Sequence, residues 1–249
     1  MHGRFLRAWG PLESHERAGE TTIDAMMNLD LLYWAAEESR RSDLATIATA
    51  HAETSARFLL RPDGSTYHAY AFDPLTGAPL RGFTHQGLSD DSTWSRGQAW
   101  AIYGFAQAAR WTGREDFTAA SSRCAEYFLA RLPAHGVPPW DFDSADQDRP
   151  DSSAGAIAAA GLLILASVHP DHGAAELYRA TATRLLVALT ERCSTTGHPG
   201  HEGLLTSGIW HLAADFAVDE ALIYGDYYYM QALTRLHEPR MTSPQTGHR

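Results

Sequence analysis

A chain of 249 residues has room for one large domain or two small ones, and 44% hydrophobic residues are enough for a globular core. The formal net charge of −10, from 20 Lys and Arg against 30 Asp and Glu, and the lack of a basic block argue against nucleic acid as a partner. No run of 18 apolar residues predicts a membrane span, and the first residues lack the apolar stretch of a signal peptide, so we expect a cytoplasmic protein.

The chain begins with polar, irregular residues 1–22 and continues mainly with helical patterns. Apolar residues repeat every three or four positions in segments that predict about seven helices, over 23–39, 43–60, 93–111, 117–132, 152–167, 174–193 and 221–237. The stretch between the second and third helices differs. There, 67–72 is typical of a short strand, 73–77 of a tight turn, and the chain then returns to Phe83 as in a hairpin. The two cysteines, Cys124 and Cys193, are interpreted as small buried hydrophobes rather than a disulfide or zinc site.

The helices show an internal repeat. Apolar, small-residue helices at 24–39, 93–111, 152–167 and 221–237 each follow a long polar loop, and three of them are followed by a more amphipathic helix. The unit recurs roughly every 60–70 residues, a period that indicates repeated structure. We therefore expect an all-α fold, a toroid of helical hairpins in which 1–249 form a single domain. Its apolar helices are buried on both sides, and the long loops gather at one mouth.

One polar and aromatic stretch, Ser89–Trp100, opens the helix predicted at 93–111. Side-chain oxygens in residues 90–93 are of the type that caps helix N-termini. Arg96 and Trp100 are one turn apart and share a face. A helix N-terminus beside a guanidinium is a plausible seat for an acidic ligand. The alternative is that Trp94 and Trp100 are core residues and Arg96 is a structural ion.

The predicted mouth of the toroid combines indoles, amides, imidazoles, carboxylates and a guanidinium, which is what recognition of a sugar acid requires. Its candidate residues are Trp9, Asp24, His68, His85, Gln86, Asp90, Asp91, Trp94, Arg96, Gln98, Trp100, Trp140, Asp151 and Trp210. No metal-binding spacing is present, so the histidines are interpreted as hydrogen-bonding residues. Asp24 either stabilises the start of its helix or, amid apolar neighbours, has a raised pKa that suits a general acid.

Several motifs resemble the unsaturated glucuronyl hydrolases, glycoside hydrolase family 88. The main ones are Ile23–Leu29 and Asp90–Gly104, with later similarity at Pro139–Phe142, Asp151–Ala154, Val218–Glu220 and Gly225–Tyr228. The resemblance runs from about Trp9 to Leu236. It implies a six-hairpin α/α barrel that acts, without metal or cofactor, on oligosaccharides left by polysaccharide lyases. Their non-reducing end is a 4,5-unsaturated uronic acid, and the reaction is hydration of its vinyl ether.

The resemblance also implies roles for individual residues. Asp24 matches the family's catalytic acid/base, which protonates C4 and then helps a water add at C5. Gln86 and His68 match an amide and an imidazole that contact the ligand, and Arg96 matches a cation near the uronate carboxylate. The residues that match the family's aromatic wall are Trp9, Trp94 and Trp100.

One departure from the family concerns a further Asp, beside a His, on an earlier helix, which nothing in this chain matches. About seven helices are also fewer than a closed ring of six hairpins contains. We therefore expect an N-terminally truncated, open ring whose exposed apolar helix faces favour self-association. Two alternatives stay open: an unsaturated rhamnogalacturonyl hydrolase of the same fold and chemistry, or an inactive fragment that at most binds acidic sugars.

Overall fold

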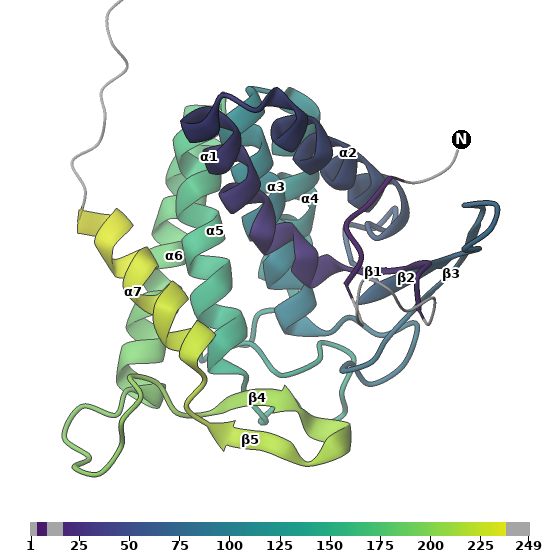
Figure 1. Cartoon of the computed structure of the whole chain (residues 1–249). Helices are drawn as coiled ribbons and strands as arrows, with labels where there is room; N and C mark the ends of the chain where they lie inside the picture. Colours follow the sequence, from purple (N-terminus) through teal and green to yellow (C-terminus); the bar gives the residue numbers. More distant parts are fainter. Residues whose placement is uncertain (1–3, 9–16, 238–249) are drawn as a thin grey trace, which may run out of the picture.

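The computed structural model describes residues 4–8 and 17–237, and in this part of the chain it contains seven α-helices. Their bounds are α1 Leu29–Ser39, α2 Ser42–Phe58, α3 Ser95–Thr112, α4 Glu115–Arg131, α5 Ser152–Val168, α6 His172–Cys193 and α7 Ile223–His237. The first six form three consecutive hairpins, and α3 and α5 lie in the middle of the assembly (Figure 1). The predicted helices are confirmed, with ends displaced by a few residues.

The first predicted helix consists of two parts. Ile23–Asn28 form a 3₁₀ helix, η1, and α1 begins only at Leu29. The backbone N–H of Ile23 donates to the carbonyl of His68 at 2.9 Å, so the start of η1 is fixed beside the second strand. On its other side η1 lies close to α3, because a Cβ added to Gly104 would come within 2.4 Å of the Met26 Cβ. The position of Asp24, on the first turn of η1, follows from these two contacts.

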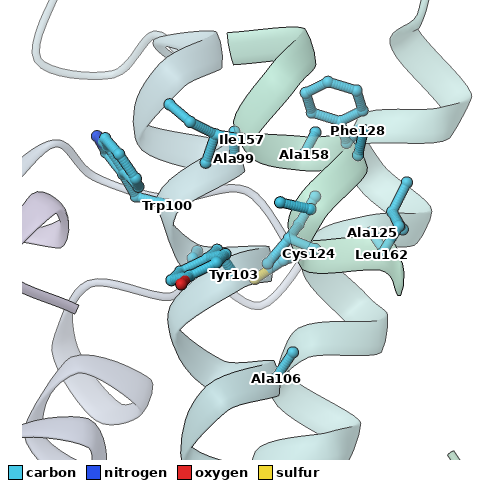
Figure 2. Close-up of a cluster of buried hydrophobic side chains, with 14 of the residues drawn as sticks. Ala99, Trp100, Tyr103, Ala106, Cys124, Ala125, Phe128, Ile157, Ala158 and Leu162 are labelled. Carbon is cyan, nitrogen blue, oxygen red and sulfur yellow. The ribbon is translucent and has the colours of Figure 1, made fainter. Parts of the chain in front are cut away.

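The hydrophobic core is centred on α3 and α5. Every residue of α5 from Ser152 to Leu165 is buried. A Cβ added to Gly161 would lie 2.8 Å from the Cα of Tyr103, so the small residues of α5 allow a close approach to α3. Figure 2 shows residues of α3, α4 and α5 meeting in this core, with Cys124 among them. Cys124 and Cys193 are both buried free thiols, as expected.

The two outer apolar helices differ from this central pair. Large apolar side chains of α1 and α7 are exposed to solvent, namely Leu31, Trp34, Ile223, Tyr227 and Met230. The expectation that each apolar helix is buried on both sides is therefore wrong for α1 and α7, because only α3 and α5 have helices packed around them. Among the described residues, no helix combines the length and hydropathy that crossing a bilayer requires.

Two small antiparallel sheets accompany the helices. The first has the order β1-β2-β3, with β1 Glu20–Thr22, β2 Ala69–Phe72 and β3 Pro79–Phe83, and pairs Thr22 with Ala69. The second pairs β4 Gly208–His211 with β5 Phe216–Glu220. In Figure 1 the first sheet lies on the right, below α2, and the second lies at the bottom of the molecule. The β2–β3 hairpin was predicted, whereas β1 and the β4–β5 hairpin were not. The fold is thus mostly helical with minor sheets.

Candidate active site

The site is built around a carboxylate and an imidazole that come from η1 and from the residue preceding β2. The Nε2 of His68 lies 3.4 Å from the Oδ2 of Asp24. Within the described chain neither atom has another hydrogen-bond partner. The bond from Ile23 N to the His68 carbonyl holds the two backbones together. The structure therefore brings the predicted acid/base residue and the predicted imidazole into a direct pair.

The tautomer of His68 follows from its other ring nitrogen. Nδ1 accepts hydrogen bonds from the backbone N–H groups of His85, at 3.1 Å, and Gln86, at 3.3 Å. An Nδ1 that accepts two N–H donors cannot itself carry a proton, so in the neutral ring the proton is on Nε2. The buried imidazole also packs on Trp94, with ring centroids 4.5 Å apart. The Nε2–H is consequently directed at Asp24.

The pKa of Asp24 results from opposing effects. Burial raises it, but the hydrogen bond and charge of His68 and the positive charge of Arg96 lower it, and the net pKa lies below the ordinary value for aspartate. The expectation of a raised pKa is therefore wrong for the unliganded site. Its apolar surroundings were recognised in the sequence, but the two basic neighbours, distant along the chain, outweigh them. Asp24 is ionised at neutral pH.

Arg96 is a buried ion with three partners. Its Nη1 donates to Asp151 Oδ2 at 3.0 Å and to the Ile209 carbonyl, and its Nη2 donates to the Trp210 carbonyl at 2.8 Å. Asp151 in turn caps α5, since its Oδ1 accepts from the backbone N–H of Ser153 at 3.1 Å. These bonds use three of the five guanidinium N–H groups. The structural interpretation of Arg96 is therefore confirmed, and two of its N–H groups have no hydrogen-bond partner among the described residues.

The predicted shared face of Arg96 and Trp100 is present. The Arg96 guanidinium lies over the ring of Tyr224 at 5.2 Å, and the ring of Trp100 is 6.5 Å from the same tyrosine. Arg96 also stacks on Trp94 at 4.3 Å. Both indoles are almost completely buried, as the core interpretation predicts. Trp100 Nε1 is nevertheless a buried donor without a partner in the described residues.

The predicted capping of α3 by residues 90–93 is wrong. Trp94 occupies the N-cap position, and no side chain caps the helix. Instead, the backbone N–H of Ser95 donates to the carbonyl of Trp140 at 3.1 Å, so a neighbouring loop satisfies the helix start. Asp90 accepts from the backbone N–H of Thr84 at 2.9 Å and pairs with Arg81 at 2.8 Å. It thus supports the turn that orients His68.

Three further predicted residues, Gln86, His85 and Trp9, have different positions. Gln86 lies at the site, and its Nε2 donates to the Trp210 carbonyl at 2.6 Å. Burial lowers the pKa of His85 to about 4, so this ring is neutral at pH 7. Trp9 lies outside the described residues. Within residues 4–8 and 17–237, no group of three His, Cys, Asp or Glu side chains is placed to hold a metal ion.

Sequence reasoning missed Tyr224 as part of this cluster, and it named Trp210 and residues 218–220 without predicting that they form a hairpin. Tyr224 directly precedes the Gly225–Tyr228 motif, and burial raises the pKa of its phenol. The hairpin supplies only backbone carbonyls to Arg96 and Gln86. A carbonyl leaves no sequence signature, so the predicted mouth residue Trp210 indicated the segment but not the backbone contacts that it makes.

The fold and the site together define a helical-hairpin protein in which a carboxylate–imidazole pair lies beside a buried guanidinium. The chain is 43% identical over 236 residues to the unsaturated glucuronyl hydrolase of Bacillus sp. (strain GL1). The alignment covers 93% of this chain and 62% of the relative. It is a homologue of the unsaturated glucuronyl hydrolases and shares their α/α toroid fold. The chain matches no protein-family model.

Two solved structures support the relationship. The crystal structure of the Bacillus sp. GL1 unsaturated glucuronyl hydrolase, described as responsible for glycosaminoglycan degradation, matches with a TM-score of 0.90 and 41% identity, covering 95% of this chain and 64% of that one. A mutant of the Streptococcus agalactiae enzyme complexed with dGlcA-GalNAc6S matches with a TM-score of 0.76 and 35% identity. This match covers 87% of our chain and 58% of the S. agalactiae chain. The chain thus spans about three fifths of the length of these relatives.

Proposed function

We propose that this chain carries the acid/base part of a glycoside hydrolase that acts on oligosaccharides with a non-reducing 4,5-unsaturated uronic acid. The observation that carries the proposal is the Asp24–His68 pair, with Arg96 close enough to lower the pKa of Asp24. A single carboxylate beside a cation fits hydration of a double bond next to a carboxylate. The unsaturated sugar acids named for the relatives agree with this substrate class.

In the proposed reaction Asp24 transfers a proton to C4 of the vinyl ether. The unliganded carboxylate is ionised, but a bound uronate brings a second negative charge and displaces water, and both effects raise the pKa of Asp24. Water then adds at C5 and returns a proton to Asp24. The resulting hemiketal opens to a ketone, which leaves C1 as a hemiacetal that releases the second sugar. The Nε2–H of His68 orients Asp24 throughout.

Arg96 and the indoles have a binding role in this proposal. The two remaining N–H groups of Arg96 are available to the uronate carboxylate, and charge-assisted bonds of this kind are strong. Gln86 adds an amide near the same carboxylate. Trp94 packs against both the imidazole of His68 and the guanidinium of Arg96, and with the buried Trp100 it forms the aromatic wall of the site.

The ultraviolet absorbance of the conjugated double bond tests the activity directly. Hydration removes the conjugation, so we expect the absorbance to fall when the protein meets a lyase-derived unsaturated disaccharide, with the free second sugar detected by mass spectrometry. Unchanged absorbance together with calorimetric binding of the disaccharide would favour the alternative of an inactive binder of acidic sugars. Turnover only of unsaturated galacturonyl-rhamnose would favour the rhamnogalacturonyl alternative.

We further propose that the chain self-associates through the exposed apolar faces of α1 and α7. Two helix faces, with Leu31 and Trp34 on α1 and Ile223, Tyr227 and Met230 on α7, expose large apolar side chains that no other described part of the chain covers. Sedimentation of the wild type and an Ile223→Asp, Met230→Asp variant tests this. We expect a concentration-dependent oligomer that the double substitution reduces to a monomer, and a wild type that is monomeric at all concentrations contradicts the proposal.

A further inference from the structure

A second cavity, of about 490 Å³, lies where the end of α2 meets the β2–β3 hairpin (Figure 1). Three arginines, two tyrosines and one aspartate supply most of its polar groups, namely Arg57, Arg61, Arg81, Tyr67, Tyr70 and Asp91. None of these residues has a role in the proposed hydration reaction. The cavity is therefore a separate place at which a ligand can bind.

Contacts from α2 and from both strands fix the aromatic wall of this cavity. Phe58, the last residue of α2, packs on Tyr70 with ring centroids 5.4 Å apart, and Tyr70 meets Tyr67 at 6.1 Å. A Cβ added to Gly82 would come within 2.3 Å of the Tyr67 ring. The absence of a side chain at this position of β3 lets the ring lie directly on the strand.

Arg61 is a half-buried cation that no carboxylate neutralises directly. Its guanidinium lies 4.1 Å over the ring of Tyr67. Within the described chain its hydrogen bonds all go to neutral oxygens, namely Ser65 Oγ at 3.1 Å, Thr93 Oγ1 at 3.4 Å and the carbonyls of Asp90 and Ser92 at 3.3 and 3.0 Å. A partly desolvated charge without a counter-ion favours binding of an anion.

Arg57 adds a second guanidinium without a counter-ion. It is exposed in the last turn of α2 and stands 5.0 Å over the ring of Phe58. It forms no ion pair with any residue that the structure describes. The third arginine, Arg81, differs because Asp90 pairs with it at 2.8 Å.

The carboxylates near the cavity leave an excess of positive charge. Asp91 is the single lining carboxylate, against three lining arginines. Asp63 is close in the chain, but its Oδ1 accepts from Ser65 Oγ at 2.6 Å and it does not line the cavity. This excess occurs in a chain with a net charge of −10. Guanidinium groups bind sulfate and phosphate through paired hydrogen bonds, and two such groups match a double negative charge.

We propose that this cavity binds a doubly charged tetrahedral oxyanion, held by Arg57 and Arg61 beside the ring of Tyr67. The ion is inorganic sulfate or phosphate, or the phosphate ester of a small molecule whose organic part lies against the tyrosines. This ligand differs from the proposed uronate substrate in charge and in shape. Binding here is independent of the proposed function, because no group of the cavity takes part in the reaction.

Titration calorimetry at low ionic strength tests the site with inorganic sulfate, inorganic phosphate and glucose 6-phosphate. Arg57→Ala removes a guanidinium that has no ion pair in the described chain, so the fold should be unaffected. The substitution is expected to raise Kd about tenfold. Arg131→Ala is the matched control and should leave Kd unchanged, since Arg131 is also exposed in the last turn of a helix, α4, and also lies over a ring, that of Tyr127, at 4.2 Å.

Weaker binding in Arg57→Ala alone supports the site. Glucose 6-phosphate that binds more tightly than inorganic phosphate then identifies a phosphate ester as the ligand, and equal or weaker binding identifies the free ion. No binding of any of the three compounds overturns the proposal, as does the same Kd in Arg57→Ala and Arg131→Ala, which would place the ion elsewhere. Acetate that binds as tightly as sulfate, with the same dependence on Arg57, would overturn the preference for a doubly charged tetrahedral ion.

Discussion

The Nε2 of His68 lies 3.4 Å from the Oδ2 of Asp24, and the opposite nitrogen of the same ring accepts two backbone N–H groups from residues 85 and 86. A turn of the chain thus selects the tautomer of the imidazole, and the imidazole directs a proton at the carboxylate. Asp90 in turn accepts a hydrogen bond from the backbone N–H of Thr84. The polar loop before α3 therefore acts on Asp24 first through the turn at residues 84–86 and then through His68. Its contribution to the site is orientation rather than helix capping.

The first prediction concerns the carboxylate itself. Asp24→Asn keeps the size of the side chain but removes the group that transfers the proton, so kcat for an unsaturated disaccharide is expected to fall by about 10²- to 10⁴-fold with little change in binding. Initial rates from the loss of ultraviolet absorbance and titration calorimetry measure the two effects. Asp43→Asn, at an exposed position of α2, serves as the control. An Asp24→Asn protein that keeps most of its rate removes Asp24 from the chemistry.

The second prediction concerns pH. The pKa of Asp24 is below its ordinary value, so its ionisation stabilises the fold above the unfolded pKa, near 3.8, and this contribution is lost as pH falls through the folded pKa. In His68→Leu the hydrogen bond and charge of His68 are gone while burial remains, so the pKa of Asp24 should rise. The variant also leaves the N–H groups of residues 85 and 86 unpaired and should lose about 1–3 kcal/mol.

Carbon NMR of the Asp24 carboxyl and urea unfolding at pH 7 and pH 3 check this prediction. The stability difference between His68→Leu and the wild type should be larger at pH 7 than at pH 3. His172→Asn, at an exposed position of α6, should change neither quantity. A pKa of Asp24 that stays low without the imidazole would show that Arg96 alone controls it.

The sequence allowed the helices to be predicted because apolar periodicity is a local property. The small residues around Gly161 are also a local pattern, but only the structure shows that they lie against α3. The pKa of Asp24 could not be predicted in the same way, since His68 and Arg96 are 44 and 72 positions further along the chain and their proximity depends on the complete fold. The same holds for the capping of α3, where a carbonyl from Trp140 performs the function expected of the local side chains.

The structure shows where the predicted site residues lie, and their roles stay predictions. Asp24, His68, Gln86 and Arg96 do come together, and the resemblance to a known family is what selected them. The buried partner of Arg96 is Asp151, which had been grouped with the mouth residues as a carboxylate of undefined role. Two strands of the β4–β5 hairpin escaped prediction because the segment is short, with no strict alternation of polar and apolar residues.

The third prediction follows from the burial of the Arg96–Asp151 pair. Both side chains are nearly inaccessible to solvent, so removing one partner leaves an uncompensated charge. Arg96→Ala is expected to destabilise the protein by about 3–5 kcal/mol, a fall in Tm on the order of 10 °C for a chain of this length. Arg110→Ala breaks a half-exposed pair with Asp30 and should cost about 0–1 kcal/mol. Equal Tm values for the two variants would contradict the structural role of Arg96.

The last prediction tests whether the packing of η1 on α3 positions Asp24. A Cβ at Gly104 would lie 2.4 Å from the Met26 Cβ and 3.0 Å from the Met26 carbonyl oxygen. Gly104→Ala must therefore displace η1, which is expected to destabilise the protein by about 1–3 kcal/mol although alanine favours helices. Because Asp24 is two residues from Met26, the displacement should also alter its distance from His68 and lower kcat.

Thermal unfolding and initial rates measure both effects. Gly173→Ala is the matched control, since the same substitution in α6 meets only the Asp171 Oδ1, at 3.2 Å, and should be neutral or slightly stabilising. The comparison isolates the contact, because the substitution is the same and helix propensity favours alanine at Gly104, in the middle of α3, at least as much as at Gly173, in the first turn of α6. If Gly104→Ala is as stable and as active as Gly173→Ala, the contact between η1 and α3 does not determine where the carboxylate lies, and the turn at residues 84–86 must position Asp24 through His68 alone.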